Sequence, residues 1–452
     1  MKTSRQLIRD AVIVNEGKQK KGSVLICDGR MADIFEAEIP EALLNSSAVT
    51  VYPAEGLYLL PGVIDDQVHF REPGMTYKGD IRTESRAAVA GGVTSFMDMP
   101  NTFPPAVTQE ALARKFDTAG AKSLANYSFY IGATNDNIDE MLKSDFSMVC
   151  GVKMFMGSST GNMLVDKPDS LEDIFRRIPA LLAVHCEKEE IIRTNTALYR
   201  EQYGEHVPVW CHPFIRSEEA CYASCSQAVA LARKYGTRLH VLHLSTAKET
   251  GLFDRRTPLP EKRITAEVCV HHLWFCDADY RQYGTAIKWN PAIKTAADRD
   301  GLLQALLDGA IDVVATDHAP HTWEEKQRSY FKSPSGGPLV QHSLAAMLEL
   351  THRGHITAEQ VAEKMCHHPA MLFGIKERGF IRKGYWADLV LVDMRRPWTV
   401  TSGNILYKCG WSPFLGQTFH SAVLKTWVNG RLVYDDGRFD ETVCGKALEF
   451  AR

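Results

Sequence analysis

The sequence contains no apolar run long enough to cross a bilayer, and its opening residues lack the apolar core of a signal peptide. The first residues lead instead into a mixed segment that carries Arg9 and Asp10. We therefore expect neither a membrane anchor nor secretion, and we predict a cytoplasmic protein.

A strong charge of one sign is also missing, because 52 lysines and arginines face 55 aspartates and glutamates. The net charge of −3 provides no basic field that would attract nucleic acid or anionic lipid. The 11 cysteines are odd in number and contain no Cys-x-x-Cys pair, which argues against a disulfide framework. We expect reduced thiols and no nucleic-acid or membrane partner.

Both chain ends have strand character, and each contains a hairpin turn signal, Asp28-Gly29 near one end and Asn429-Gly430 near the other. The segments expected as strands are Leu7–Asn15, Val24–Phe35, Ala387–Asp393 and Lys425–Val433. Short strands so far apart are not stable alone. We therefore predict that both ends combine into one small β-sandwich module.

Between the ends, eight short apolar runs alternate with stretches of helical character. The runs are Leu59–Ile64, Val93–Met97, Tyr127–Ile131, Val152–Phe155, Leu181–Val184, Leu239–Leu242, Ile264–Val268 and Val313–Ala315. The helical stretches include Asp80–Ala90, Gln109–Ala119, Leu171–Arg177, Ser217–Tyr235 and Ala297–Leu307. This alternation favours a closed (β/α)8 TIM barrel over an open sheet, and 452 residues accommodate a barrel with an accessory module. We predict the barrel at residues 57–375 and the β module at residues 1–56 and 376–452.

Residues with metal-binding or substrate-binding chemistry lie at the ends of these apolar runs, where a TIM barrel builds its active site. They are Gln67, His69, Asn101, Lys153, His185, His243, His271, His272, Asp317, His318 and His321. A single histidine after a strand is usually packed or hydrogen-bonded. Because His69, His185, His243 and Asp317 recur at one position on different strands, we predict a divalent metal site there.

Lys153 is unusual because it lies within an apolar strand, where a lysine must lose or pair its charge. One interpretation is a lysine whose amine reaches water or pairs with an acid. The interpretation that we prefer is a neutral amine that reacts with carbon dioxide, giving a carbamate that bridges two metal ions.

Two long motifs carry a family resemblance. Pro61–Gly74 contains Asp-x-Gln-x-His followed by Arg-Glu-Pro-Gly, and Ala315–His321 reads Ala-Thr-Asp-His-Ala-Pro-His, with Lys326 downstream. Further matching segments are Met99–Thr102, Trp289–Pro291 and Asp388–Asp393. Together they resemble the amidohydrolase superfamily and, within it, the dihydroorotases, from about Leu57 to Tyr434.

The resemblance implies a metal-dependent cyclic amide hydrolase with two zinc ions, bridged by carboxylated Lys153 and by a hydroxide. It implies that His185 and His243 hold one ion and that His69 and Asp317 hold the other. It also implies that Asp317 accepts the proton of the hydroxide and passes it to the leaving amide nitrogen.

The activity implied is the reversible hydrolysis of (S)-dihydroorotate to N-carbamoyl-L-aspartate in pyrimidine biosynthesis. Family members bind the substrate carboxylate through residues that match Arg71, Asn101 and His321, with Asn290 on a nearby loop. Arg71 also follows His69 by two residues, on the same side of an extended chain, and its planar fork suits a carboxylate. The alternative for Arg71 is a salt bridge between elements.

The sequence departs from the family at Gln67, where the first histidine of the family's His-x-His is expected. Gln67 ligates through its weaker amide oxygen, or water replaces it, or one metal binds loosely. The segment Ser335–Pro338 resembles hydantoinase loops as much as dihydroorotase loops. The alternatives are therefore an allantoinase or hydantoinase, and a non-catalytic dihydroorotase-like scaffold.

Smaller expectations concern neighbouring residues. On a strand, His271 and His272 would point to opposite faces, so we expect one hydrogen bond to a metal ligand and one packed ring. Asp65 matches a family position that orients a ligand, whereas Asp66 has no role that the sequence defines. The dominance of symmetric pairs among oligomers favours a homodimer.

Overall fold

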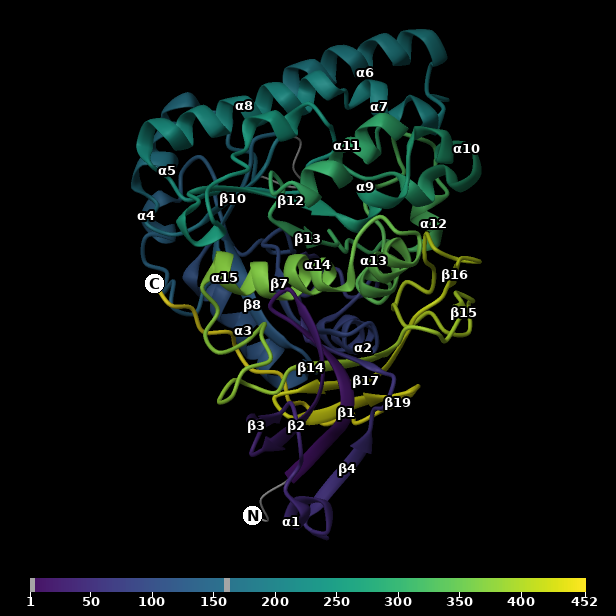
Figure 1. Ribbon diagram of the computed structural model, residues 1–452. Coiled ribbons are helices and arrows are strands. Elements are labelled where there is room, and N and C mark those ends of the chain that lie inside the picture. Colours follow the sequence, from purple (N-terminus) through teal and green to yellow (C-terminus); the bar gives the residue numbers. More distant parts are fainter. Residues whose placement is uncertain (1–4, 158–162) are drawn as a thin grey trace.

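The computed structural model describes residues 5–157 and 163–452, and it consists of a barrel with a separate sheet beside it (Figure 1). The first four residues, which contributed to the expectation about the N-terminus, lie outside the described residues. Among the helices that the structure describes, none combines the length and the apolar character needed to cross a bilayer.

Eight parallel strands form the barrel, and each pairs with the next in chain order. They are β6 (Val63–Val68), β7 (Val93–Asp98), β8 (Asn126–Gly132), β9 (Gly151–Phe155), β10 (Leu182–His185), β11 (Leu239–Val241), β12 (Ile264–Cys269) and β13 (Val313–Ala315). Nearly every residue in these strands is buried, because helices cover the outside and side chains fill the inside. The predicted (β/α)8 barrel is confirmed.

The helices predicted between the strands are present, and side-chain caps fix where several of them begin. They are α2 (Ile81–Ala90), α3 (Gln109–Lys122), α5 (Pro168–Arg177), α8 (Glu218–Tyr235) and α11 (Ala296–Leu307). The side chains of Asp80, Thr108, Ser217 and Thr295 each accept a hydrogen bond from a backbone N–H in the first turn. The remaining helices are α1 (Glu41–Leu44), α4 (Ile138–Met141), α6 (Glu189–Tyr203), α7 (His212–Ile215), α9 (Val270–Trp274), α10 (Tyr280–Tyr283), α12 (Trp323–Lys326), α13 (Ser343–His352), α14 (Ala358–Ala362) and α15 (His368–Phe373).

Both chain ends contribute to one nine-stranded, mostly antiparallel sheet, as the sequence predicted. Its strands are β1 (Arg5–Asn15), β2 (Lys18–Cys27), β3 (Arg30–Phe35), β4 (Val49–Pro53), β5 (Tyr58–Pro61), β14 (Leu389–Asp393), β17 (Ala422–Val428), β18 (Arg431–Asp435) and β19 (Arg438–Phe439). Antiparallel pairing of β5 with β14 joins the two ends. A short separate pair is formed by β15 (Trp398–Thr399) and β16 (Thr418–Phe419).

The barrel closes where β13, the last strand, returns to β6, the first. The backbone N–H of His69 donates to the carbonyl oxygen of His318 at 2.7 Å. The carboxylate of Asp65 accepts from the hydroxyl of Thr316 at 2.6 Å, and from the backbone N–H groups of Thr316 and Gln67 at 3.2 and 3.3 Å. Asp65 therefore holds the seam together from inside the wall.

We expect Asp65→Ala to lower the midpoint of thermal unfolding by several degrees, because three buried donors lose their acceptor at about 1–3 kcal/mol each. Circular dichroism during heating measures the midpoint. Asp136→Ala is the matched control, because that side chain is 82% exposed and pairs with exposed Lys167. Equal midpoints for the two variants would contradict a role for Asp65 at the seam.

Candidate metal centre and substrate pocket

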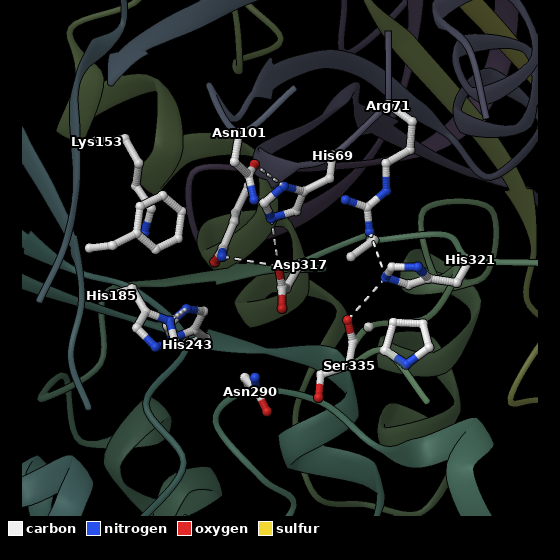
Figure 2. A pocket seen from close by; sticks show the side chains of 15 residues that line it. His69, Arg71, Asn101, Lys153, His185, His243, Asn290, Asp317, His321 and Ser335 are labelled. Atoms are coloured by element: carbon white, nitrogen blue, oxygen red, sulfur yellow. Dashed lines mark hydrogen bonds and ion pairs between the residues drawn. The ribbon is translucent and has the colours of Figure 1, made fainter. Parts of the chain in front are cut away.

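A cavity of about 270 Å³ lies at the carboxyl ends of the barrel strands (Figure 2). All nine residues that the sequence proposed as metal or substrate contacts line it, and so does Gln67. The nine are His69, Arg71, Asn101, Lys153, His185, His243, Asn290, Asp317 and His321. Residues from across the sequence thus share one pocket, as a barrel rim requires.

His69 and Asp317 face one another in the middle of the cavity. The Nδ1 atom of His69 lies 2.7 Å from Oδ1 of Asn101, to which it donates, and its Nε2 lies 3.1 Å from Oδ1 of Asp317. In a neutral ring that donates through Nδ1, Nε2 carries a lone pair. A lone pair directed at a carboxylate oxygen is an arrangement that a cation between the two atoms stabilises.

His185 and His243 form a second pair. Nε2 of His185 lies 3.0 Å from Oε2 of Glu187, and its Nδ1 lies 3.1 Å from Nε2 of His243. Burial lowers the pKa of both histidines, so both rings are neutral at neutral pH. Because the Nε2–H group of His185 donates a hydrogen bond to Glu187, the other ring nitrogen, Nδ1, carries the lone pair and presents it to the cavity.

Glu187 itself is a charged acceptor deep in the wall. It is fully buried, and Arg216 forms an ion pair with it. Burial opposes the charge, but Arg216 and His185 together lower the pKa of Glu187 to about 2. An imidazole that donates to a carboxylate is a typical arrangement around metal-binding histidines.

Lys153 points into the same side of the cavity as His185 and His243 (Figure 2). Its Nζ atom is buried and has no hydrogen-bond partner among the described residues. Burial lowers the pKa of Lys153 to about 7, although Asp317 and Glu267 oppose that shift. A substantial fraction of this amine is therefore neutral and nucleophilic at neutral pH.

Gln67 is held between two neighbours. Its amide nitrogen donates to Oδ1 of Asp317 at 3.2 Å, and its amide oxygen lies 3.8 Å from the sulfur of Cys269. In this orientation the amide supports the carboxylate and turns its oxygen toward the thiol. The pair His69 and Asp317, the pair His185 and His243, and Lys153 still provide nitrogen and oxygen atoms that suit divalent cations as ligands.

The opposite side of the cavity is positively charged. A terminal nitrogen of Arg71 lies 3.0 Å from Nε2 of His321, and Nζ of Lys78 lies 2.9 Å from its Nδ1. Burial lowers the pKa of Arg71 to about 10, so the guanidinium remains charged at neutral pH. Burial and the charge of Arg71 hold the pKa of His321 well below its usual range. Glu325 forms an ion pair with Lys78 at 3.1 Å, so Arg71 is the cation here that is left to meet an anion.

The loop that contains Ser335–Pro338, which the sequence analysis identified only by its resemblance to family loops, completes the pocket. Pro334, Ser335 and Gly336 line the cavity, and buried Lys326 donates to the carbonyl oxygens of Pro334 and Gly336 at 2.9 and 2.8 Å. Gly336 has a φ of +120°, and a Cβ there would lie 2.7 Å from the carbonyl oxygen of Ala319. The loop therefore approaches the rim more closely than another residue would allow.

Sequence reasoning missed Lys78 and Glu187. Lys78 follows no apolar run directly, and only its contact with His321 shows its place in the site. Glu187 follows His185 by two residues, which was the one available signal. His318, which lies in the second motif, is structural, because its Nε2 contacts Glu84 at 2.9 Å and its Nδ1 accepts backbone N–H groups.

The expectation for His271 and His272 was wrong in its geometry. Both lie on the short helix α9 rather than on a strand, and both are buried. Adjacent residues on a helix are separated by about 100°, so the two rings can approach one another. Their ring centroids are 4.1 Å apart.

Asp66 belongs to a buried cluster beneath the cavity. Its carboxylate lies 3.3 Å from Nε2 of His240, which is 3.7 Å from Glu267. Burial works against a charged ring, but the two carboxylates raise the pKa of His240 to about 9. The backbone N–H of His243 donates to Glu267 at 3.0 Å, so this cluster supports the floor of the cavity.

The fold is a (β/α)8 barrel whose rim cavity has imidazole, carboxylate and amine groups on one side and the buried guanidinium of Arg71 on the other. The chain belongs to the amidohydrolase family, which its residues 58–433 match. This family is generally metal-dependent, in agreement with the donor set of the cavity.

Two relatives and one solved structure show which members of the family this chain is similar to. A dihydroorotase of Halobacterium salinarum is 33% identical over 433 residues, covering 95% of this chain and 96% of that protein. An allantoinase of Bacillus velezensis is 31% identical over 437 residues, covering 95% and 94%. The L-hydantoinase (dihydropyrimidinase) of Arthrobacter aurescens superposes with a TM-score of 0.89 at 26% identity, covering 96% and 97%.

We expect Glu187→Gln to lower metal affinity about 10- to 100-fold, because the neutral amide orients and polarises His185 less well. Competition with a chromophoric chelator measures the affinity. Glu190→Gln is the control, since that side chain is 67% exposed and lies outside the cavity. Unchanged affinity in Glu187→Gln would mean that His185 does not bind the metal.

Proposed function

We propose that this protein is a dihydroorotase, which reversibly hydrolyses (S)-dihydroorotate to N-carbamoyl-L-aspartate. The observation that carries the proposal is the buried, charged Arg71 beside His321, across the cavity from His185 and His243 (Figure 2). Dihydroorotate has a carboxylate on its ring, whereas hydantoin and allantoin do not. The identity to a named dihydroorotase over nearly the whole chain supports the same substrate.

In this proposal the cavity holds two zinc ions. His185 and His243 would hold one, His69 and Asp317 the other, and a carboxylated Lys153 would bridge them. When bound, the ions would supply Lewis acidity toward the ring carbonyl and would lower the pKa of water.

Carboxylation of Lys153 is chemically accessible at its observed position. The neutral Nζ attacks carbon dioxide, a carbon–nitrogen bond forms, and the amine loses one proton to water. The product carries a negative charge and two oxygen donors, which a bare lysine does not. The pKa of about 7 that burial gives Lys153 provides the neutral amine that this reaction needs.

Arg71 and His321 would bind the ring carboxylate. The guanidinium is anchored through Nε, which donates to the carbonyl oxygen of Pro320 at 3.0 Å. Anchoring before binding reduces the entropy that is lost when the anion is bound. Asn101, whose oxygen accepts from His69, and Asn290, which lines the pocket, would orient the ring.

Asp317 would transfer the proton during hydrolysis. Water adds to the ring carbonyl carbon and releases a proton to the carboxylate of Asp317. The carbon–nitrogen bond of the ring then breaks, and Asp317 returns the proton to the departing nitrogen. Gln67, whose amide nitrogen donates to Oδ1 of Asp317, holds the carboxylate in place for both steps.

The alternative is hydrolysis of an uncharged ring, as in an allantoinase or hydantoinase. It is favoured by the named allantoinase relative and by the similarity to a hydantoinase structure. The Ser335–Pro338 segment, part of which lines the pocket, agrees with it. The two functions share the metal chemistry and differ in the anion site.

The purified, zinc-supplemented protein is expected to hydrolyse L-dihydroorotate in preference to hydantoin and allantoin. We expect Arg71→Met to reduce kcat/KM for dihydroorotate about a hundredfold, because a buried partner of the carboxylate is lost. Spectrophotometric assays of all three rings measure this. Arg328→Met is the control, because Arg328 does not line the cavity. Turnover of the uncharged rings alone, unaffected by Arg71→Met, would favour the alternative.

We expect Lys153→Ala to lose bound metal and at least about a hundredfold in kcat, because the bridging group disappears. Elemental analysis after gel filtration counts the ions. Lys364→Ala is the matched control, because Lys364 is also buried but donates to the carbonyl oxygen of Ile311, outside the cavity. Full metal content in folded Lys153→Ala would exclude a bridging role.

A further inference from the structure

A second group of metal-binding side chains lies behind the wall of the cavity. Cys269 ends strand β12, and His271 and His272 follow in the first turn of α9. One donor atom from each of the three residues lies within 4.8 Å of the others. All three residues are buried, and none of them lines the cavity.

The two rings present nitrogen atoms that the protein does not use. Nε2 of His272 lies 3.2 Å from the carbonyl oxygen of Pro291, so this nitrogen is the protonated one and Nδ1 carries a lone pair. Nδ1 of His272 has no hydrogen-bond partner within the described residues, and His271, whose ring interacts with the backbone of Thr316, keeps a second nitrogen without such a partner. Buried polar atoms nearly always have a hydrogen-bond partner in native proteins, so these nitrogen atoms are available to bind a ligand.

A buried cysteine close to two adjacent histidines does not by itself produce this arrangement. Cys366 is also buried and is also followed by two histidines, His367 and His368. Those rings turn away to the carbonyl oxygens of Gly379 and Asp312, each at 2.7 Å, and the thiol donates to a backbone oxygen. The fold therefore gathers the donor atoms at Cys269 and disperses them at Cys366.

We infer that Cys269, His271 and His272 form a binding site for a divalent ion of the zinc class, separate from the catalytic centre. A thiolate and two imidazoles are ligands that zinc prefers in tetrahedral sites. Thiolate also discriminates against magnesium and calcium, which take oxygen ligands. The thiol of Cys269 donates to Glu267 at 3.4 Å, so the carboxyl group of Glu267 lies beside the proposed ion.

Gln67 connects this site to the cavity. Its amide oxygen is directed to the sulfur of Cys269 at 3.8 Å, while its amide nitrogen contacts Asp317. The glutamine therefore offers an oxygen as a fourth donor on the Cys269 side. This gives the residue that replaces the family's histidine a use outside the catalytic centre, and the inference does not depend on which ring the enzyme hydrolyses.

Cobalt substitution tests the site, because thiolate bound to Co²⁺ gives a near-ultraviolet charge-transfer band that nitrogen and oxygen ligands do not give. Metal-stripped, reduced protein is titrated with Co²⁺, and bound cobalt is counted by elemental analysis. We expect a band that saturates at one sulfur-bound ion per chain. Cobalt binding without such a band in folded wild-type protein would overturn the inference.

Cysteine variants identify which sulfur atom binds the cobalt ion. Cys269→Ser is expected to lose the band and one bound ion per chain, whereas Cys366→Ser, the matched control, is expected to keep both. Persistence of the band in Cys269→Ser would overturn the inference. If Cys269→Ser does not fold, His272→Gln replaces it: a weakened band supports the site, and an unchanged titration excludes His272 and overturns the three-ligand site. Neither result depends on activity, so failure here leaves the proposed hydrolase function intact.

Discussion

The closure of the barrel between β6 and β13 is the constraint on which the site depends. Asp65 accepts two hydrogen bonds from Thr316 across this seam and a third from Gln67 on its own strand. The closed seam brings His69 within 3.1 Å of Asp317, although 248 residues separate them in the sequence. An open sheet would leave these two strands at opposite edges, and their side chains would not share a cavity.

Burial then sets the chemistry of the groups that closure collects. With little water available, Lys153 has a pKa of about 7 and the rings of His185 and His243 remain neutral. Glu187 stays charged although it is buried, because Arg216 forms an ion pair with it. The cavity consequently has one side with several lone pairs and an opposite side with the charged guanidinium of Arg71. A cyclic substrate with a ring carboxylate matches that division.

Much of the fold could be predicted because the signals are local. Each buried parallel strand is a continuous apolar run, and caps such as Asp80 and Ser217 mark helix starts in the sequence. The candidate site residues could be located because they follow those runs. The prediction for His271 and His272 was wrong because the strand ends at Cys269 and a short helix begins. An apolar pattern alone does not show where a strand ends when a helix begins at the next residue.

The sequence by itself determined the barrel, the sheet formed by both chain ends, and the residue types available at the rim. It did so because hydrophobic periodicity and turn residues act over a few positions. Only the tertiary structure decided how Gln67 is oriented, that Lys78 joins Arg71 at His321, and that Cys269 meets two imidazoles. Those contacts join residues on separate elements, and their distances depend on how the closed barrel packs rather than on spacing along the chain.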